Sequence, residues 1–122
     1  MKTKIALFSL LVLASLAGCT AFVPVQTLDK TGIDALLTAT KLPILSDAEA
    51  TGRTVISEVV GYSCMNQATE PSATRVGATD QVKILAVQKG ATAVSGLVCS
   101  EGGVSLVRNC WQSWECKGKA LK

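Results

Sequence analysis

The chain has 122 residues, of which 48% are hydrophobic and 17% are charged, and its formal net charge is +3. This length suffices for one domain and is too short for two. The sequence contains no histidine, so the commonest general base at neutral pH and the usual Ser-His and Cys-His nucleophile systems are absent, and we expect a protein that is not an enzyme and uses no cofactor.

The first 18 residues are typical of a bacterial lipoprotein signal peptide. Lys2 and Lys4 give a positive start, and about ten mostly aliphatic residues follow, too few to span a bilayer of roughly 30 Å as a helix. Small residues directly before Cys19 predict cleavage at that point and attachment of lipid to the cysteine. Thr20, in a position where Asp favours the inner membrane, favours the outer membrane. Cleavage removes two of the twelve basic residues and leaves ten against nine acidic ones, so no basic surplus for nucleic acid remains.

A tether (19–41) is predicted to join the lipid to a folded domain (42–122). The tether lacks a strong Pro, Gly or Ser bias, and only Pro24 interrupts it early. Residues 29–37 can form a short amphipathic turn, although so short a helix is marginal alone in water. The apolar side of this turn carries Ile33, Leu36 and Leu37.

The domain is predicted to begin with short elements. Residues 41–45 are predicted to form a strand at a sheet edge, where Pro43 is tolerated. Ser46 followed by Glu49 is a capping box, so a brief helix should start there. Gly52 should end that helix.

A longer strand and a longer helix are predicted to follow. The β-branched residues at 54–60 favour a strand, and 61–71 is predicted to be a loop that contains Cys64. Apolar residues with helical spacing predict the main helix over 72–89. Gly90 is a natural stop because it can adopt positive φ just past the last turn.

The C-terminal part is predicted to consist of strands. One strand is expected at 91–98, a turn at 101–103, and a long, partly irregular final strand at 104–119. If the strands on either side of the main helix are parallel neighbours, they form a right-handed βαβ unit, with which the last strand can pair antiparallel. The predicted fold is therefore α+β, a small sheet of about four strands with one long helix on one face.

Four cysteines remain when Cys19 is assigned to lipid, and they predict two disulfides. An exported protein lies in an oxidising compartment, and a domain of about 80 residues benefits from covalent staples. A zinc site is disfavoured because the chain has neither histidine nor a Cys-x-x-Cys pair. Redox catalysis is disfavoured for the same lack of a Cys-x-x-Cys turn. Three pairings are open for the four residues Cys64, Cys99, Cys110 and Cys116.

Two tryptophans and several basic residues are candidates for contact with a partner. On an ideal last strand Cys110, Gln112, Trp114 and Cys116 share one face, so Trp114 is expected to be a core aromatic that covers both bridges, whereas Trp111 points the other way. Trp111 is thus either an exposed binding anchor or packed against the short first helix. The basic side chains are either a solvated edge that discourages strand pairing or a contact for anionic lipopolysaccharide or an acidic partner. These basic candidates are Arg108, Lys117 and Lys119, with Lys122 near them.

Two motifs of the domain occur together with a specific spacing of cysteines. The first is Glu58-Val-Val-Gly-Tyr-Ser-Cys64, followed by Asn66-Gln67, and the second is Gly90-Ala-Thr-Ala-Val94. The four domain cysteines are spaced by 35, 11 and 6 residues. In these features the domain resembles the RcsF family of outer-membrane lipoproteins, in which a segment similar to the first motif leads into the first domain cysteine. The likeness extends over about residues 42–121. The resemblance implies disulfides Cys64–Cys110 and Cys99–Cys116, whereas a simple hairpin argument would join Cys99 to Cys110.

The resemblance also implies a function. RcsF-like proteins sense envelope stress, are held by the β-barrel assembly protein BamA and by porins, and engage the inner-membrane regulator IgaA to release the Rcs phosphorelay. One departure is the tether, which is long, proline-rich and basic in the family but has about twenty residues here, with an extended reach of at most about 70 Å. The alternative is an envelope lipoprotein with a structural or outer-membrane assembly role and no part in signalling.

Overall fold

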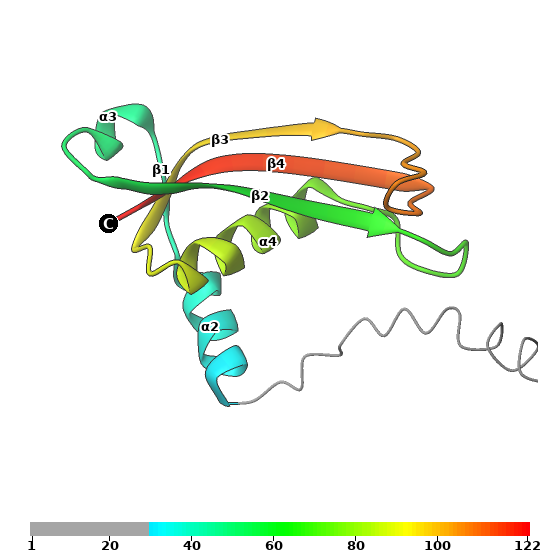
Figure 1. The fold of residues 1–122 in the computed structure, drawn as a ribbon, viewed down its shortest axis with the longest axis horizontal. Coiled ribbons are helices and arrows are strands. Elements are labelled where there is room, and N and C mark those ends of the chain that lie inside the picture. The colour runs from blue at the N-terminus through cyan, green and yellow to red at the C-terminus, as the bar shows by residue number, and fades with distance from the viewer. Residues whose placement is uncertain (1–29) are drawn as a thin grey trace, which may run out of the picture.

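A computed structural model describes residues 30–122 of the chain (Figure 1). The predicted signal peptide (1–18), the predicted lipidation site Cys19 and the first part of the predicted tether lie outside these residues. In chain order the elements are α2 (Lys30–Lys41), β1 (Ile44–Leu45), α3 (Asp47–Ala50), β2 (Val55–Met65), α4 (Arg75–Gln88), β3 (Ala93–Glu101) and β4 (Gln112–Leu121). None of the helices within 30–122 is both long and apolar enough to cross a membrane.

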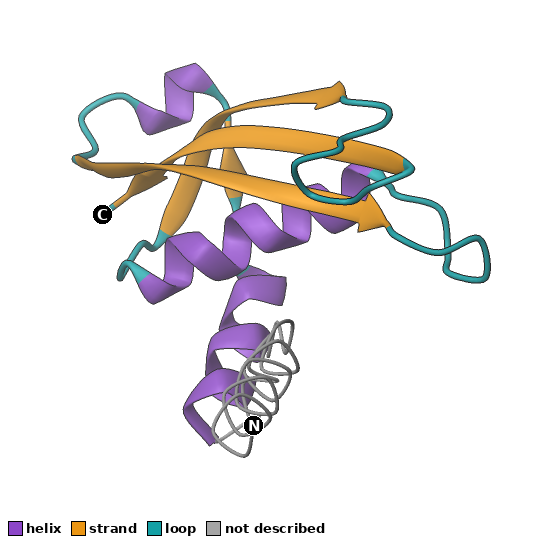
Figure 2. Cartoon of the chain, turned by 45° about the vertical axis from the view of Figure 1, so that its right-hand side comes forward, coloured by secondary structure: helices purple, strands orange, loops and turns teal. Residues whose placement is uncertain are grey.

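The four strands form one mixed sheet in the order β1-β3-β4-β2, and α4 packs along one face (Figure 1, Figure 2). β1 pairs parallel with β3, while β4 pairs antiparallel with both β3 and β2. The predicted α+β class, with a long helix on one face of a small sheet, is confirmed. The two strands flanking α4 run in the same direction but are not neighbours, because β4 folds back against β3 and offers its other edge to β2.

Helix α4 starts at a threonine cap. The backbone N–H of Gly77 donates to Thr74 Oγ1 at 3.0 Å, which satisfies one of the free donors of the first turn. The helix therefore starts after Thr74 rather than at Ser72, the first residue of the predicted range. At the other end Gly90 has a φ of +80°, as its predicted role as a stop requires.

The face of the sheet that meets α4, called here the covered face, is built from small residues at close distance. Ala78, Val82 and Ala86 follow one another at four-residue spacing on the buried side of α4. A Cβ atom at Gly61 of β2 would lie 2.6 Å from the backbone nitrogen of Val82 and would also meet the carbonyl oxygen of Ala78. Gly61 thus sets how closely the helix approaches the sheet. The buried cluster around this contact consists of Leu42, Val59, Ala78, Val82, Ala86, Ala91, Val94, Cys116 and Ala120.

The predicted boundaries of β2, β4 and β1 are wrong, and pairing with β4 explains the first. β2 continues to Met65 because β4 pairs with it along that whole length, so Cys64 lies on a strand and not in the loop predicted at 61–71. β4 itself begins only at Gln112, because residues 102–111 form a loop that is closed on itself. The predicted first strand is reduced to the two residues of β1.

The N-terminal elements include one confirmed prediction and one addition. The capping box is present, since the backbone N–H of Ser46 donates to Glu49 Oε2 at 2.9 Å and Ser46 Oγ accepts from the backbone N–H of Glu49. Residues 30–41, which the sequence assigns to the tether, form the twelve-residue helix α2, which packs against α4. Ala39 on α2 is buried, and this tertiary contact supplies the stability that a short helix lacks in isolation.

Candidate functional site

The two disulfides lie on opposite faces of the sheet. Cys99 and Cys116 stand directly opposite each other on β3 and β4, and Thr79 of α4 lies 3.6 Å from the Cys116 sulfur, so this bridge is on the covered face. Cys64 stands opposite Ser113, whose side chain points to the other face, called here the open face. Cys64 is bonded to Cys110. The pairing that the resemblance implies is confirmed, and the hairpin pairing of Cys99 with Cys110 is not formed.

The Cys64–Cys110 bridge holds residues 102–111, called here the stapled loop, over one end of the open face (Figure 2). Ser105 and Cys110 exchange two backbone hydrogen bonds of 2.9 Å, which close the tip into a short hairpin. Ser113 lies buried beneath the loop and donates from its Oγ to the carbonyl oxygen of Gly103 at 2.9 Å. The loop is therefore fixed at its tip, at its base and by a covalent bond.

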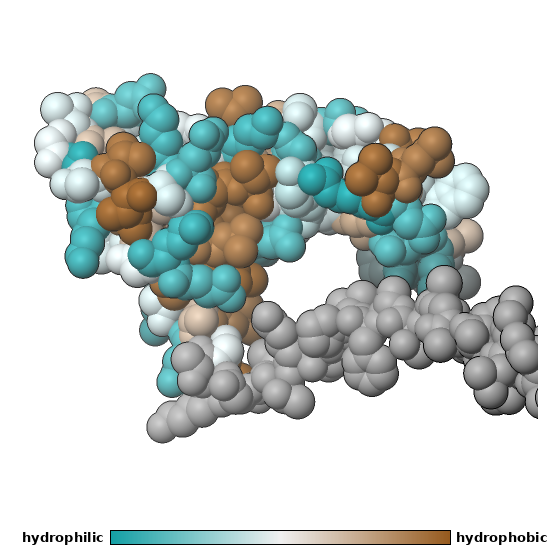
Figure 3. Space-filling model, viewed as in Figure 1, coloured by the Kyte–Doolittle hydropathy of each residue, from teal (hydrophilic) through white to brown (hydrophobic). Residues whose placement is uncertain are grey.

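The stapled loop exposes large apolar side chains. Leu106 and Val107 at the tip are 92% and 99% exposed, and Val104 and Trp111 beside them are also mostly exposed. Hydrophobic side chains gather over this loop at the right-hand end of Figure 3. Scattered exposed aliphatic residues are ordinary, but a cluster on a rigid loop is typical of contact surfaces.

Trp111 stands where the loop returns to the sheet. Its backbone N–H donates to the carbonyl oxygen of Met65 at 2.8 Å, while its ring is 64% exposed. Of the two arrangements considered from the sequence, the exposed one is therefore present. Trp114 shares the covered face with Cys116 and packs against the core, as predicted. The prediction that it covers both bridges is wrong, because Cys110 lies before β4 and is bonded to Cys64 on the open face.

The predicted basic residues lie on or beside the open face. The Arg108 guanidinium stacks 3.5 Å from the centre of the Tyr62 ring, a cation–π contact that joins the loop to β2. Lys117 Nζ lies 3.0 Å from Glu115 Oε1 on the same strand. Lys119 stands opposite Glu58 of β2.

These contacts set the charge state of the open face. The hydrogen bond from Lys117 is the largest cause that holds the pKa of Glu115 below its ordinary value, and Tyr62 and Arg108 act in the same direction. The carboxylate of Glu115 in turn raises the pKa of Lys117. At neutral pH Glu115 is thus ionised and surrounded by cationic groups. Arg108, Lys117 and Lys119 thus share the open face with the carboxylates of Glu58 and Glu115.

Sequence reasoning missed Tyr62, Glu115 and the aliphatic tip of the stapled loop. It treated 104–119 as one strand, in which Leu106 and Val107 would be ordinary strand residues. The sequence did contain a signal for the loop, namely a Leu-Val pair between a Gly-Gly turn and a cysteine. When such a cysteine is bonded to another strand, the segment between the turn and the cysteine is held as a loop.

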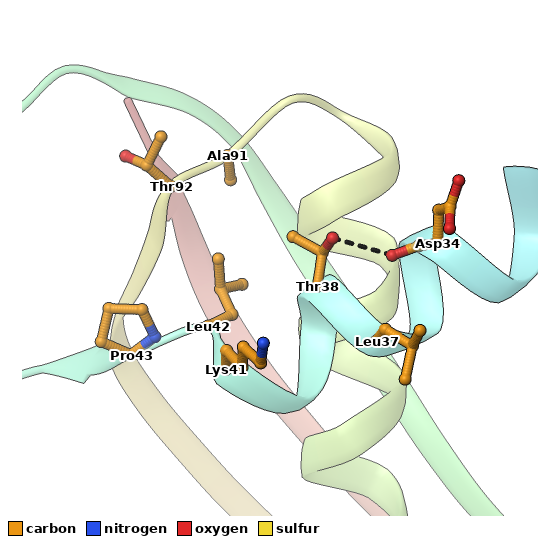
Figure 4. A pocket seen from close by; sticks show the side chains of 8 residues that line it. All are labelled: Asp34, Leu37, Thr38, Lys41, Leu42, Pro43, Ala91 and Thr92. Atoms are coloured by element: carbon orange, nitrogen blue, oxygen red, sulfur yellow. Dashed lines mark hydrogen bonds between the residues drawn. The ribbon is translucent and has the colours of Figure 1, made fainter.

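A hollow at the other end of the molecule lies where α2 meets the turn between α4 and β3 (Figure 4). Its volume is about 480 Å³. It is lined by Asp34, Leu37, Thr38, Lys41, Leu42, Pro43, Ala91 and Thr92. Among residues 30–122 no group of three or more His, Cys, Asp or Glu side chains is placed to hold a metal ion. No known family model matches the chain, and no curated protein matches its sequence.

Proposed function

We propose that the chain is a lipid-anchored outer-membrane lipoprotein that senses envelope stress and signals to the Rcs phosphorelay through protein–protein contacts, as RcsF-like proteins do. The observation that supports this proposal is the disulfide arrangement. The non-consecutive pairing that the family resemblance implies is present, one bridge on each face of the sheet. The proposal rests on this agreement between the arrangement of the bridges and the one that the resemblance implies.

The stapled loop is the surface through which the proposed contacts would be made. Because it is already fixed by a disulfide and by backbone hydrogen bonds, binding would cost little conformational entropy. Leu106, Val107 and Trp111 offer apolar anchors. The basic residues around Glu115 would guide an acidic surface toward them. By resemblance the partners would be BamA, porins and IgaA, and anionic lipopolysaccharide would meet the same basic residues.

In-cell photo-crosslinking tests this proposal. A photoreactive residue is placed at Leu106 or Trp111, and at Val76 as a matched control, because Val76 is equally apolar and well exposed but lies on α4. The host encodes IgaA and the Rcs kinase components and carries an Rcs-dependent reporter. We expect IgaA or BamA to be captured from the loop positions and not from Val76, and envelope damage to induce the reporter only when the chain is present. An inactive reporter with no capture of either protein would contradict the signalling role.

The alternative, a structural or assembly role without signalling, is favoured by one observation. Because α2 starts at Lys30, only eleven residue steps separate it from Cys19 (30 − 19), an extended reach of at most about 40 Å. So short a tether keeps the domain near the membrane that holds the lipid. Crosslinking only to outer-membrane or peptidoglycan-bound proteins, with a silent reporter, would support this alternative.

A further inference from the structure

Helix α2 exposes its large aliphatic side chains and buries a small one, which is the reverse of the usual arrangement. It packs against α4, and the residue of α2 that is buried is the small Ala39, which is 3% exposed. Its large aliphatic residues Ile33, Leu36 and Leu37 are 45%, 44% and 57% exposed. An amphipathic helix on a globular protein normally turns its aliphatic stripe toward the core. The exposed stripe of α2, Ile33, Leu36 and Leu37, therefore calls for a partner outside the folded body.

The neighbouring hollow extends this apolar surface, because several of its lining residues are also apolar. Leu37 lines it together with the apolar residues Leu42, Pro43 and Ala91 (Figure 4). In Figure 3 hydrophobic surface extends from the sheet down toward α2. The apolar area is thus wider than the helix stripe alone.

Cationic and polar groups border the apolar area. Lys41 lines the hollow, and Arg53 Nη1 donates to Thr92 Oγ1 on its rim at 3.2 Å. Asp34 is the single acidic side chain among the residues that line the hollow. An aliphatic floor with two cations beside it matches the interface of an anionic bilayer, where acyl chains lie under phosphate groups.

The position of α2 in the chain indicates which partner covers its exposed aliphatic stripe. It is the first described element after Cys19, at most about 40 Å of extended chain away. If Cys19 carries lipid, as the proposed function requires, the bilayer is the apolar surface held at the highest effective concentration beside α2. A helix of twelve residues, about 18 Å long, cannot span the hydrocarbon layer and is suited to lie along it.

We propose that α2 lies on the surface of the phospholipid bilayer that holds Cys19, with Ile33, Leu36 and Leu37 in the boundary between headgroups and acyl chains and with Lys41 and Arg53 at the phosphates. This contact orients the domain on the membrane. It is a second, non-covalent attachment next to the lipid, and it places the stapled loop on a fixed side of the anchored body.

The test uses the lipidated mature chain in vesicles of phosphatidylglycerol and phosphatidylethanolamine that carry brominated acyl chains. A Leu37→Trp variant reports on α2, and a Leu106→Trp variant is the matched control, because both positions are exposed leucines on the same anchored protein. The signal of the native tryptophans is subtracted with the unsubstituted chain. We expect bromine to quench the new tryptophan of Leu37→Trp and to leave that of Leu106→Trp unquenched.

Two further variants test the cause of the quenching. Adding Ile33→Asp and Leu36→Asp should reduce it at least about twofold, since charges would replace the side chains that enter the interface. Both positions are exposed, so circular dichroism should show an unchanged fold. Lys41→Gln should weaken the quenching on anionic vesicles and have a smaller effect on phosphatidylcholine vesicles.

The outcomes separate this inference from the proposed function. Mass spectrometry that finds Cys19 without lipid would overturn both. Lipidated protein with equal quenching of the two tryptophans would overturn the membrane contact of α2 and leave the sensor proposal intact. Absence of quenching at Leu37→Trp together with a dimer in detergent would assign the aliphatic stripe to a second copy of the chain, and would also overturn the membrane contact.

Discussion

The two faces of the sheet are made by alternate residues of the same strands, yet they differ in almost every physical property. On the covered face Gly61 and Cys116 lie against α4 with no room for a larger side chain. On the open face, one residue along each strand, Tyr62, Glu115 and Lys117 form cation–π and ionic contacts at the surface. The two-residue period of a strand thus separates a close-packed face from a polar one within a single pair of strands.

The disulfides follow the same division. Cys99–Cys116 joins two residues that already face each other in the ladder between β3 and β4. Cys64–Cys110 joins β2 to a loop that lies outside the ladders of the sheet. One bridge strengthens the covered face, and the other positions the surface that we propose for binding.

Changing Gly61 to valine should have the largest effect, since it tests the claim that the covered face has no spare volume. The new Cβ would meet backbone atoms of α4, which cannot move aside as a flexible side chain can. We expect the free energy of unfolding to fall by at least about 4 kcal/mol, measured by urea denaturation. Ser100→Val, which adds volume on the open side of β3, is the control and should change stability by less than about 0.5 kcal/mol. Equal effects of the two substitutions would contradict the contrast between the faces.

The second-largest effect is expected when the Cys64–Cys110 bridge is removed by changing both cysteines to alanine. The bridge closes a sequence separation of 46 residues, for which chain entropy predicts a loss of up to about 4 kcal/mol, lowered by any structure in the unfolded state. The folded protein should be depleted in cells. Amide hydrogen exchange should rise most in residues 102–111, and unchanged protection there would show that the loop does not need its staple.

The equivalent change of Cys99 and Cys116 to alanine should cost somewhat less global stability. This bridge spans only 17 residues, which corresponds to about 3 kcal/mol. Because Cys116 is fully buried, the exchange should increase in the core of β3 and β4 and not in the stapled loop. A pattern of exchange identical to that of the first double variant would remove the distinction between the two bridges.

The smallest effect is expected from the ion pair on the open face. The folded-state pKa of Glu115 is lowered chiefly by Lys117, so the pair stabilises the protein above the ordinary pKa of a glutamate and its contribution is lost as the pH falls through the lowered value. In an NMR titration Glu115 should lose its proton below the ordinary pKa of a glutamate, and Lys117→Ala should move its midpoint upward. Because both side chains are exposed, the melting temperature should hardly change. A midpoint insensitive to Lys117→Ala would show that this contact does not set the charge of the face.

Local sequence signals predicted the elements that depend on neighbouring residues. The capping box at Ser46 and Glu49 and the helix stop at Gly90 need only a few adjacent residues, and both are confirmed. The insertion of β4 between β2 and β3 was not predicted, because strand order depends on which edges remain free after other strands have paired. The packing of α2 was not predicted for a similar reason, since its buried residue is the small Ala39, which carries little hydrophobic signal in the sequence.

The candidate binding surface was likewise predicted only in part. Trp111 and Arg108 were visible in the sequence as an unpaired aromatic and a basic residue. Their setting was not visible, because the cation–π contact of Arg108 with Tyr62 joins residues 46 positions apart (108 − 62). Likewise, Leu106 and Val107 became a surface only when Cys110 was bonded to Cys64.

The α+β class, the long helix and the four cysteines available for two bridges could be predicted from the sequence, because these follow from composition and from periods of two and 3.6 residues. Only the folded chain shows which face each bridge occupies, that residues 102–111 form a loop and not a strand, and that α2 buries Ala39 while its large residues are exposed. The physical reason is that each of these features depends on the distance between segments far apart in the chain. Such distances are set by close packing, at points like Gly61, and not by local preference.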